Sequence, residues 1–66
     1  MSVIREYRKR RKLTQEQFGK KVGVSTGTVI RWEHRSNIPT LKQAASICKI
    51  LRLPFMKLYN EFKEVE

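Results

Sequence analysis

The chain has 66 residues, 39% of them hydrophobic and 32% charged, which is the composition of one globular domain with little room for an enclosed active site. Its apolar runs are too short for a membrane span or a signal peptide. Its net charge of +9 favours a polyanionic partner and by itself leaves DNA, RNA and an anionic membrane surface open.

A first helix is expected over residues 3–12, with Ser2 as its N-cap. Ile4 and Tyr7 form a short apolar stripe on it. The rest of the helix is strongly basic, through Arg5, Arg8, Lys9, Arg10, Arg11 and Lys12. Such a run is as consistent with a solvated helix face as with a polyanion-binding surface, and both readings stay open for most of its members.

A second helix is expected to begin after Thr14, because Thr14 and Gln17 have the spacing of a capping box. Phe18 starts its buried side, and Gly19 lies beside that side, where a second helix can approach closely. Gly23 follows the last apolar residue and is expected to end the helix in the left-handed conformation.

A third helix is expected from Thr26, with Ser25 as its N-cap. At about 100° per residue, Val29 and Trp32 point to one side, and the side chains opposite them fall within roughly 140° of arc. That arc holds Thr26, Gly27, Ile30, Arg31 and His34. The pattern predicts a helix that is anchored on one side and offers the other to an external surface. Trp32 is expected in the core rather than stacked on an unpaired base.

The stretch LTQEQFGKKVGVSTGTVIRWE, residues 13–33, resembles the helix-turn-helix of the phage Cro and repressor family of DNA-binding proteins. The resemblance rests on a small residue at Gly19, a turn glycine at Gly23, and aliphatic residues at Val22, Val24 and Val29. It extends through IREYRKRRKLTQ before this stretch and IPTLKQAASICKIL after it. It implies an all-α fold of the lambda-repressor type, a compact bundle of five short helices around a central helix-turn-helix, as a single domain over residues 1–66.

The resemblance also implies which residues contact DNA bases. The family's base-contacting positions match Thr26, Gly27 and Arg31, although Gly27 replaces the usual polar residue. Arg31 has the fork geometry to bind guanine O6 and N7, a contact worth about 1 to 3 kcal/mol of discrimination. Ile30 is either a contact to a thymine methyl or an exposed side chain without a role.

Contacts to the DNA backbone are expected at helix starts and in the loop after the third helix, where N–H groups and cations meet phosphates. The candidate residues are Thr14, Gln15, Ser25, Thr28, His34, Arg35 and Lys42. For Thr14 and Ser25, helix capping alone is the alternative role.

The family also suggests a structural ion pair. An arginine at the position of Arg8 pairs there with the glutamate that matches Glu33, and this pair would fix the first helix on the third. Lys12 stands where the family often has glycine, which leaves the loop geometry at this point open.

A fourth helix is expected after Thr40, which forms a second capping box with Gln43. Its inward stripe is predicted from apolar residues at i, i+3, i+4, i+7 and i+10. These are Leu41, Ala44, Ala45, Cys48 and Leu51. Cys48 is expected to be a buried small hydrophobe rather than a reactive thiol.

A last helix starts at Leu53 and Pro54 and carries more apolar side chains than a small domain can bury, so an exposed apolar patch is expected. The candidates for a dimer interface are Leu53, Pro54, Phe55, Met56 and Tyr59. The alternative is that these residues only cover the core. Residues 60–66 are expected to fray.

Groups for catalysis or metal binding are few. Cys48 is the only cysteine, which excludes an internal disulfide and a cysteine-based zinc cage and fits a reducing compartment such as a bacterial cytoplasm. His34 is the only histidine and has no partner at catalytic or metal spacing. The sequence therefore predicts no enzymatic activity, metal, cofactor or small-molecule ligand.

These observations favour a small transcriptional regulator, a Cro-like repressor that binds a palindromic operator in double-stranded DNA as a dimer, with half-sites about 34 Å apart. A DNA-binding antitoxin and a restriction-system controller share this chemistry. A protein-interaction adaptor and an RNA- or membrane-surface binder are alternatives from other classes.

Overall fold

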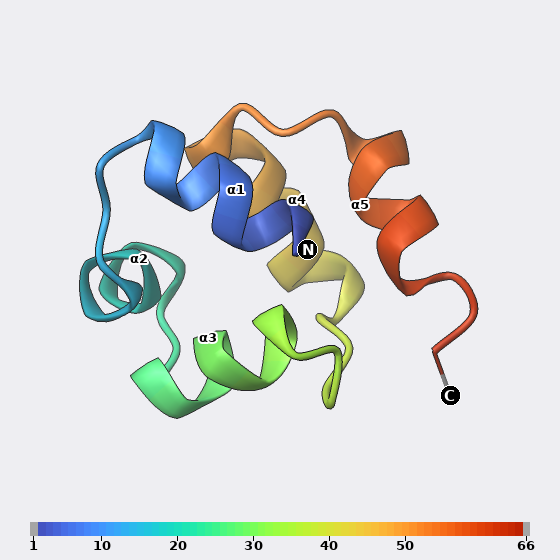
Figure 1. Ribbon diagram of the computed structural model, residues 1–66, viewed down its shortest axis with the longest axis horizontal. Coiled ribbons are helices and arrows are strands. Elements are labelled where there is room, and N and C mark those ends of the chain that lie inside the picture. Colours follow the sequence, from blue (N-terminus) through green and yellow to red (C-terminus); the bar gives the residue numbers. More distant parts are fainter. Residues whose placement is uncertain (1, 66) are drawn as a thin grey trace.

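The computed structural model describes residues 2–65, and five helices follow one another along this part of the chain (Figure 1). They are α1 (Val3–Arg10), α2 (Gln15–Val22), α3 (Thr26–Glu33), α4 (Leu41–Leu51) and α5 (Phe55–Phe62). Residues 2–65 form no strand. The predicted all-α fold with a central helix-turn-helix is thus confirmed.

The predicted helix starts are confirmed by their caps. The Ser2 hydroxyl accepts a hydrogen bond from the Arg5 N–H at 3.1 Å, and the Ser25 hydroxyl accepts one from the Thr28 N–H at 3.2 Å. Both predicted capping boxes are complete: Thr14 with Gln17, and Thr40 with Gln43. The start of each of these four helices is therefore specified by a capping residue and a partner three positions later in the sequence.

The helix ends share a motif that the sequence indicated only once. After each of α1 to α4, a residue with positive φ is followed by one whose N–H donates to the carbonyl five residues back, at 2.8 to 3.2 Å. The positive-φ residues are Lys12, Gly23, Arg35 and Arg52. Only the glycine adopts this conformation without strain, whereas the three basic residues each incur a cost on the order of 1 kcal/mol. Their positive charge at the negative end of a helix offsets part of it.

The core is built from one or two large side chains of each helix. Ile4, Phe18, Val29, Trp32 and Ile47 are completely buried. Leu51, Leu58 and Phe62 close it from α4 and α5. The indole N–H of Trp32 has no acceptor among the described residues, so this residue contributes volume rather than a polar contact.

The helices are arranged around α1 and α4 (Figure 1). α1 packs on α3, α4 and α5, while α2 packs on both α3 and α4. α3 thus has neighbours on one side only, and its outer side is left to solvent.

The predicted inward stripe of α4 is partly wrong. Leu41 is 79% exposed and Ala45 is exposed, whereas Ile47, which was not in the stripe, is completely buried. The buried side runs through Ala44, Ile47 and Leu51, and at about 100° per residue this places Ala45 well outside it. Leu41 lies in the first turn, beyond the edge of the core.

Two predictions for the last helix also need correction. Leu53, a candidate for the dimer interface, is only 3% exposed, because the left-handed Arg52 and the bond from the Leu53 N–H to the Cys48 carbonyl (3.1 Å) turn it into the core. Residues 60–62, which were assigned to a frayed tail, belong to α5: the helix continues to the buried Phe62, and Val65 packs against the core. Glu66 lies outside the described residues.

Candidate nucleic-acid interface

The turn between α2 and α3 is set by two glycines. Gly23 has φ 88° and lets the chain leave α2 in a left-handed conformation. Gly19 lets the turn approach α2: a Cβ there would lie 2.8 Å from the Val24 carbonyl oxygen and 3.4 Å from Val29 Cγ2. The sequence predicted a close approach by a helix, and the structure places the backbone of the turn itself in that space.

α3 has the predicted orientation. Val29 and Trp32 are completely buried, while Arg31 and His34 are exposed and Ile30 is 39% exposed. Thr26 and Gly27 are partly buried at the start of the helix. The helix therefore presents its predicted outer arc to solvent.

The Arg31 side chain lies back along α3. Its Nη2 donates to Thr28 Oγ1 at 3.2 Å, and Thr28 Oγ1 lies 3.1 Å from the Ser25 hydroxyl. Its Nη1 lies 3.4 Å from the position that a Cβ on Gly27 would occupy. The missing side chain at Gly27 thus gives the guanidinium room, and a single exposed hydrogen bond holds it in place.

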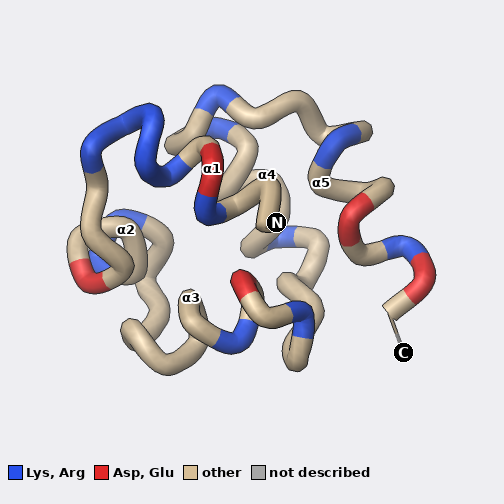
Figure 2. The backbone as a smooth tube through the Cα atoms, in the orientation of Figure 1, with Lys and Arg blue, Asp and Glu red and all other residues tan. Residues whose placement is uncertain are grey.

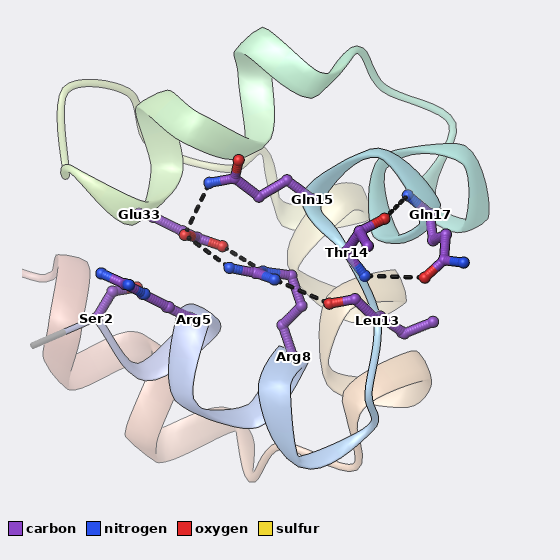
Figure 3. A network of polar contacts seen from close by, with 8 residues as sticks. All are labelled: Ser2, Arg5, Arg8, Leu13, Thr14, Gln15, Gln17 and Glu33. Atoms are coloured by element: carbon purple, nitrogen blue, oxygen red, sulfur yellow. Dashed lines mark hydrogen bonds and ion pairs between the residues drawn. The ribbon is translucent and has the colours of Figure 1, made fainter.

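The ion pair implied by the resemblance is formed and is buried (Figure 3). Arg8 Nε donates to Glu33 Oε2 at 2.7 Å and Nη2 donates to Oε1 at 3.3 Å, with 8% and 5% of the two side chains exposed. Arg8 Nη1 also donates to the Leu13 carbonyl at 2.8 Å. The pair therefore joins α1, the loop before α2, and α3.

Gln15 belongs to this network. Its Nε2 donates to Glu33 Oε1 at 3.2 Å, so the side chain points inward rather than toward a partner in solvent (Figure 3). The hydroxyls of Thr14 and Ser25 are likewise occupied as helix caps.

Several predicted phosphate contacts lie around one polar hollow of about 610 Å³, between the starts of α1 and α2 and the end of α3. Its lining includes Thr14, Gln15, His34 and Arg35, together with Arg5. Arg5 was not among the predicted phosphate contacts. It lies three residues before Arg8, on the same side of α1, and this spacing is the sequence signal for its place in the lining. Lys42 is exposed on the first turn of α4 and does not line this hollow.

A carboxylate on α5 restrains one of these cations. Glu61 Oε1 accepts a hydrogen bond from the Val3 N–H at 3.0 Å and lies 3.4 Å from Arg35 Nη1. The side chain of Glu61 is 12% exposed and that of Arg35 is 45% exposed. No sequence pattern pointed to this pair, because its residues are 26 positions apart.

An apolar groove of about 260 Å³ lies between α4, α5 and the loop before α4. Its exposed lining includes Ile38, Leu41, Phe55 and Tyr59, and Met56 beside it is 61% exposed. The Phe55 and Tyr59 rings stack with their centroids 6.2 Å apart. The exposed apolar patch predicted here is confirmed, without Leu53 and with Ile38 and Leu41 added.

The cysteine and the acidic side chains form no reactive or metal-binding arrangement among residues 2–65. Cys48 is half-buried, and this burial raises the pKa of its thiol. Residues 2–65 contain no group of three or more His, Cys, Asp or Glu side chains that could hold a metal ion. No helix in this part of the chain is long and apolar enough to cross a membrane.

A five-helix domain whose central helix-turn-helix is anchored by Val29 and Trp32 and exposes Arg31 is a helical DNA-binding domain. The chain belongs to the helix-turn-helix family, since residues 4–58 match the model of that family, described as Helix-turn-helix. The protein is accordingly a DNA-binding regulator of a generally non-enzymatic family. No curated protein and no solved structure matches the chain.

Proposed function

We propose that the protein is a sequence-specific, Cro-like transcriptional repressor that reads the major groove of double-stranded DNA with α3 and binds a palindromic operator as a dimer. The observation that supports this most directly is the orientation of α3. Its bulky residues, Val29 and Trp32, are in the core, and Arg31 stands at the surface with one weak restraint.

Base reading is assigned to the outer arc of α3. Arg31 exchanges its single hydrogen bond to Thr28 for two hydrogen bonds, to guanine O6 and N7. Thr26 offers a hydroxyl or a methyl group to a base edge, and Ile30 packs against a thymine methyl. Gly27 lets the backbone come close to the groove.

Backbone contacts are assigned to the polar hollow, to the start of α2 beside it, and to the start of α3, which lies outside it. Two helix N-termini donate backbone N–H groups to phosphates. One is the first turn of α2, at Thr14 and Gln15, and the other is the first turn of α3, after Ser25. The positive end of each helix dipole adds to the attraction. His34 and Arg35 add side-chain contacts at the hollow, and Thr28 and Lys42 add side-chain contacts outside it. Charge in this hollow positions the duplex, and α3 specifies its sequence.

Arg31→Ala is expected to remove the preference for guanine at one base pair of each half-site, a loss of about 1 to 3 kcal/mol. Arg35→Ala is the matched control, because it removes an equal charge from a phosphate contact. It should weaken binding to every duplex and lower the salt slope by about 0.9. Selection of bound sites from random duplex DNA, followed by titration of each variant, measures both effects. Equal losses on all duplexes for both variants would refute base reading by Arg31.

Glu61→Gln is expected to raise affinity for any duplex several-fold, because Arg35 then contacts phosphate without first leaving a carboxylate. The glutamine keeps an oxygen for the Val3 N–H, so α1 retains its contact. Glu64→Gln, an exposed change of equal charge three residues on, is the control. Fluorescence anisotropy at about 50 to 200 mM salt compares the variants. If both variants bind alike, Arg35 does not contact phosphate.

Dimer formation is assigned to the apolar groove and the exposed side chains beside it, Pro54, Phe55, Met56 and Tyr59. Tyr59→Asp is expected to place a charge in the buried interface and so to convert the dimer to a monomer in sedimentation equilibrium. Affinity for the full operator should fall more than about tenfold, with the base preference of a half-site unchanged. Asn60→Asp adds the same charge to the adjacent exposed position of α5. A Tyr59→Asp variant that stays dimeric would place the interface elsewhere.

A further inference from the structure

Most exposed cations lie away from the reading helix. Figure 2 shows several of them where α1, α2 and α4 end, and others along α5. The first group, which we call the distal basic face, consists of Arg11, Lys12, Lys20, Lys21, Lys49 and Arg52, all of them exposed. α3 and the three residues after it carry only Arg31 and Arg35 as lysine or arginine.

Helix ends explain only part of this charge. Each helix C-terminus carries about half a negative elementary charge, so three of them offset about 1.5 of the six positive charges. The Cα atoms extend over 27 × 23 × 22 Å, and charges are screened within about 8 Å at physiological salt. A duplex bound at α3 therefore leaves the distal basic face without a counter-charge.

The distal basic face also has a hollow, of about 500 Å³, lined by Arg11, Leu13, Lys21 and Ile50. Leu13 and Ile50 are partly buried and pack against the core, so they form an apolar floor. Arg11 and Lys21 are exposed and form a cationic rim. None of these four residues lines the polar hollow beside α3.

We propose that this hollow binds an acidic segment of a partner protein, with one apolar side chain on Leu13 and Ile50 and flanking carboxylates paired with Arg11 and Lys21. The rim alone would suit any polyanion. The floor favours a peptide, because a phosphate backbone gains nothing from apolar surface while a leucine side chain does. Because the hollow and α3 are on different sides, the protein can hold DNA and this partner together.

A fluorescein-labelled synthetic peptide of Glu-Leu-Glu repeats serves as the probe for the full chain. Binding is expected to shift the amide NMR signals of Leu13, Lys21 and Ile50, and to be equally tight when α3 is occupied by a duplex. A peptide with serine in place of leucine should bind about tenfold more weakly, since it cannot use the floor.

The double variant Arg11→Glu/Lys21→Glu is expected to lose about tenfold or more in peptide affinity. Lys57→Glu/Lys63→Glu changes the net charge equally at α5 and should keep the affinity. Thermal unfolding of both variants verifies that they remain folded. The proposal fails if the serine peptide binds equally well, if both double variants lose affinity alike, or if the signals of α3 shift instead. It also fails if a second duplex binds the DNA complex through Arg11 and Lys21 while neither peptide binds.

Discussion

Arg8→Ala is expected to lower the free energy of unfolding by about 3 to 5 kcal/mol, because it leaves the Glu33 carboxylate buried without its counter-charge. The effect is large for a chain of this size, whose total stability is about 3 to 10 kcal/mol by the usual value per residue. Glu33→Ala should cost a similar amount, since it strands the guanidinium instead. Urea unfolding monitored by circular dichroism gives both values.

The double variant Arg8→Ala/Glu33→Ala should be more stable than the sum of the single effects predicts, by about 0.5 to 3 kcal/mol, because no charge is then stranded. Glu6→Ala is the matched control on the same helix. It breaks the pair to Arg10, whose side chains are 58% and 42% exposed, and should cost less than about 1 kcal/mol. Additive effects at Arg8 and Glu33 would show that the pair contributes no coupling.

Gly19→Ala is expected to destabilise the domain by about 1 to 3 kcal/mol, although alanine is the better helix former. The added Cβ would lie 2.8 Å from the Val24 carbonyl oxygen, and the turn cannot retreat easily because the Val24 N–H is bonded to the Gly19 carbonyl at 2.8 Å. Each kcal/mol lowers the midpoint of thermal unfolding by about 4 to 8 °C in a domain of this size.

Gly27→Ala is the control for this prediction. Its Cβ would meet the flexible end of Arg31 at 3.4 Å and the Ser25 hydroxyl at 3.7 Å, both without a clash, so the helix should be stabilised by up to about 1 kcal/mol. If both alanine variants raise the melting temperature, the packing of the turn on α2 does not require glycine at position 19.

The parts of the fold that were predicted correctly depend on local signals. The caps at Ser2, Thr14, Ser25 and Thr40 each involve a hydroxyl and an N–H three residues on, so short sequence patterns specify them. The buried side of α3 followed from helical periodicity. The exposed apolar patch followed from the excess of large apolar side chains over what a small core can hold.

The errors arose where a residue's environment depends on other helices. Leu41 has the same apolar character as Leu51, yet Leu41 is 79% exposed and lines an open groove, whereas Leu51 is 1% exposed and belongs to the core. Leu53 was expected on the surface and is buried, because the chain turns at Arg52 in a left-handed conformation. This conformation is usually indicated by a glycine in the sequence, and none is present here.

The sequence by itself determined where helices begin, which side of α3 is anchored, and, through the family resemblance, that Arg8 and Glu33 form an ion pair. These features are encoded by neighbours within one or two helical turns or by a shared motif. Only the tertiary structure decided that Arg5 joins His34 and Arg35 at one hollow, that Glu61 restrains Arg35, and that Arg11 and Lys21 flank Leu13 and Ile50. Such contacts join residues that are far apart in the chain, and their proximity follows from how the helices pack rather than from any local preference.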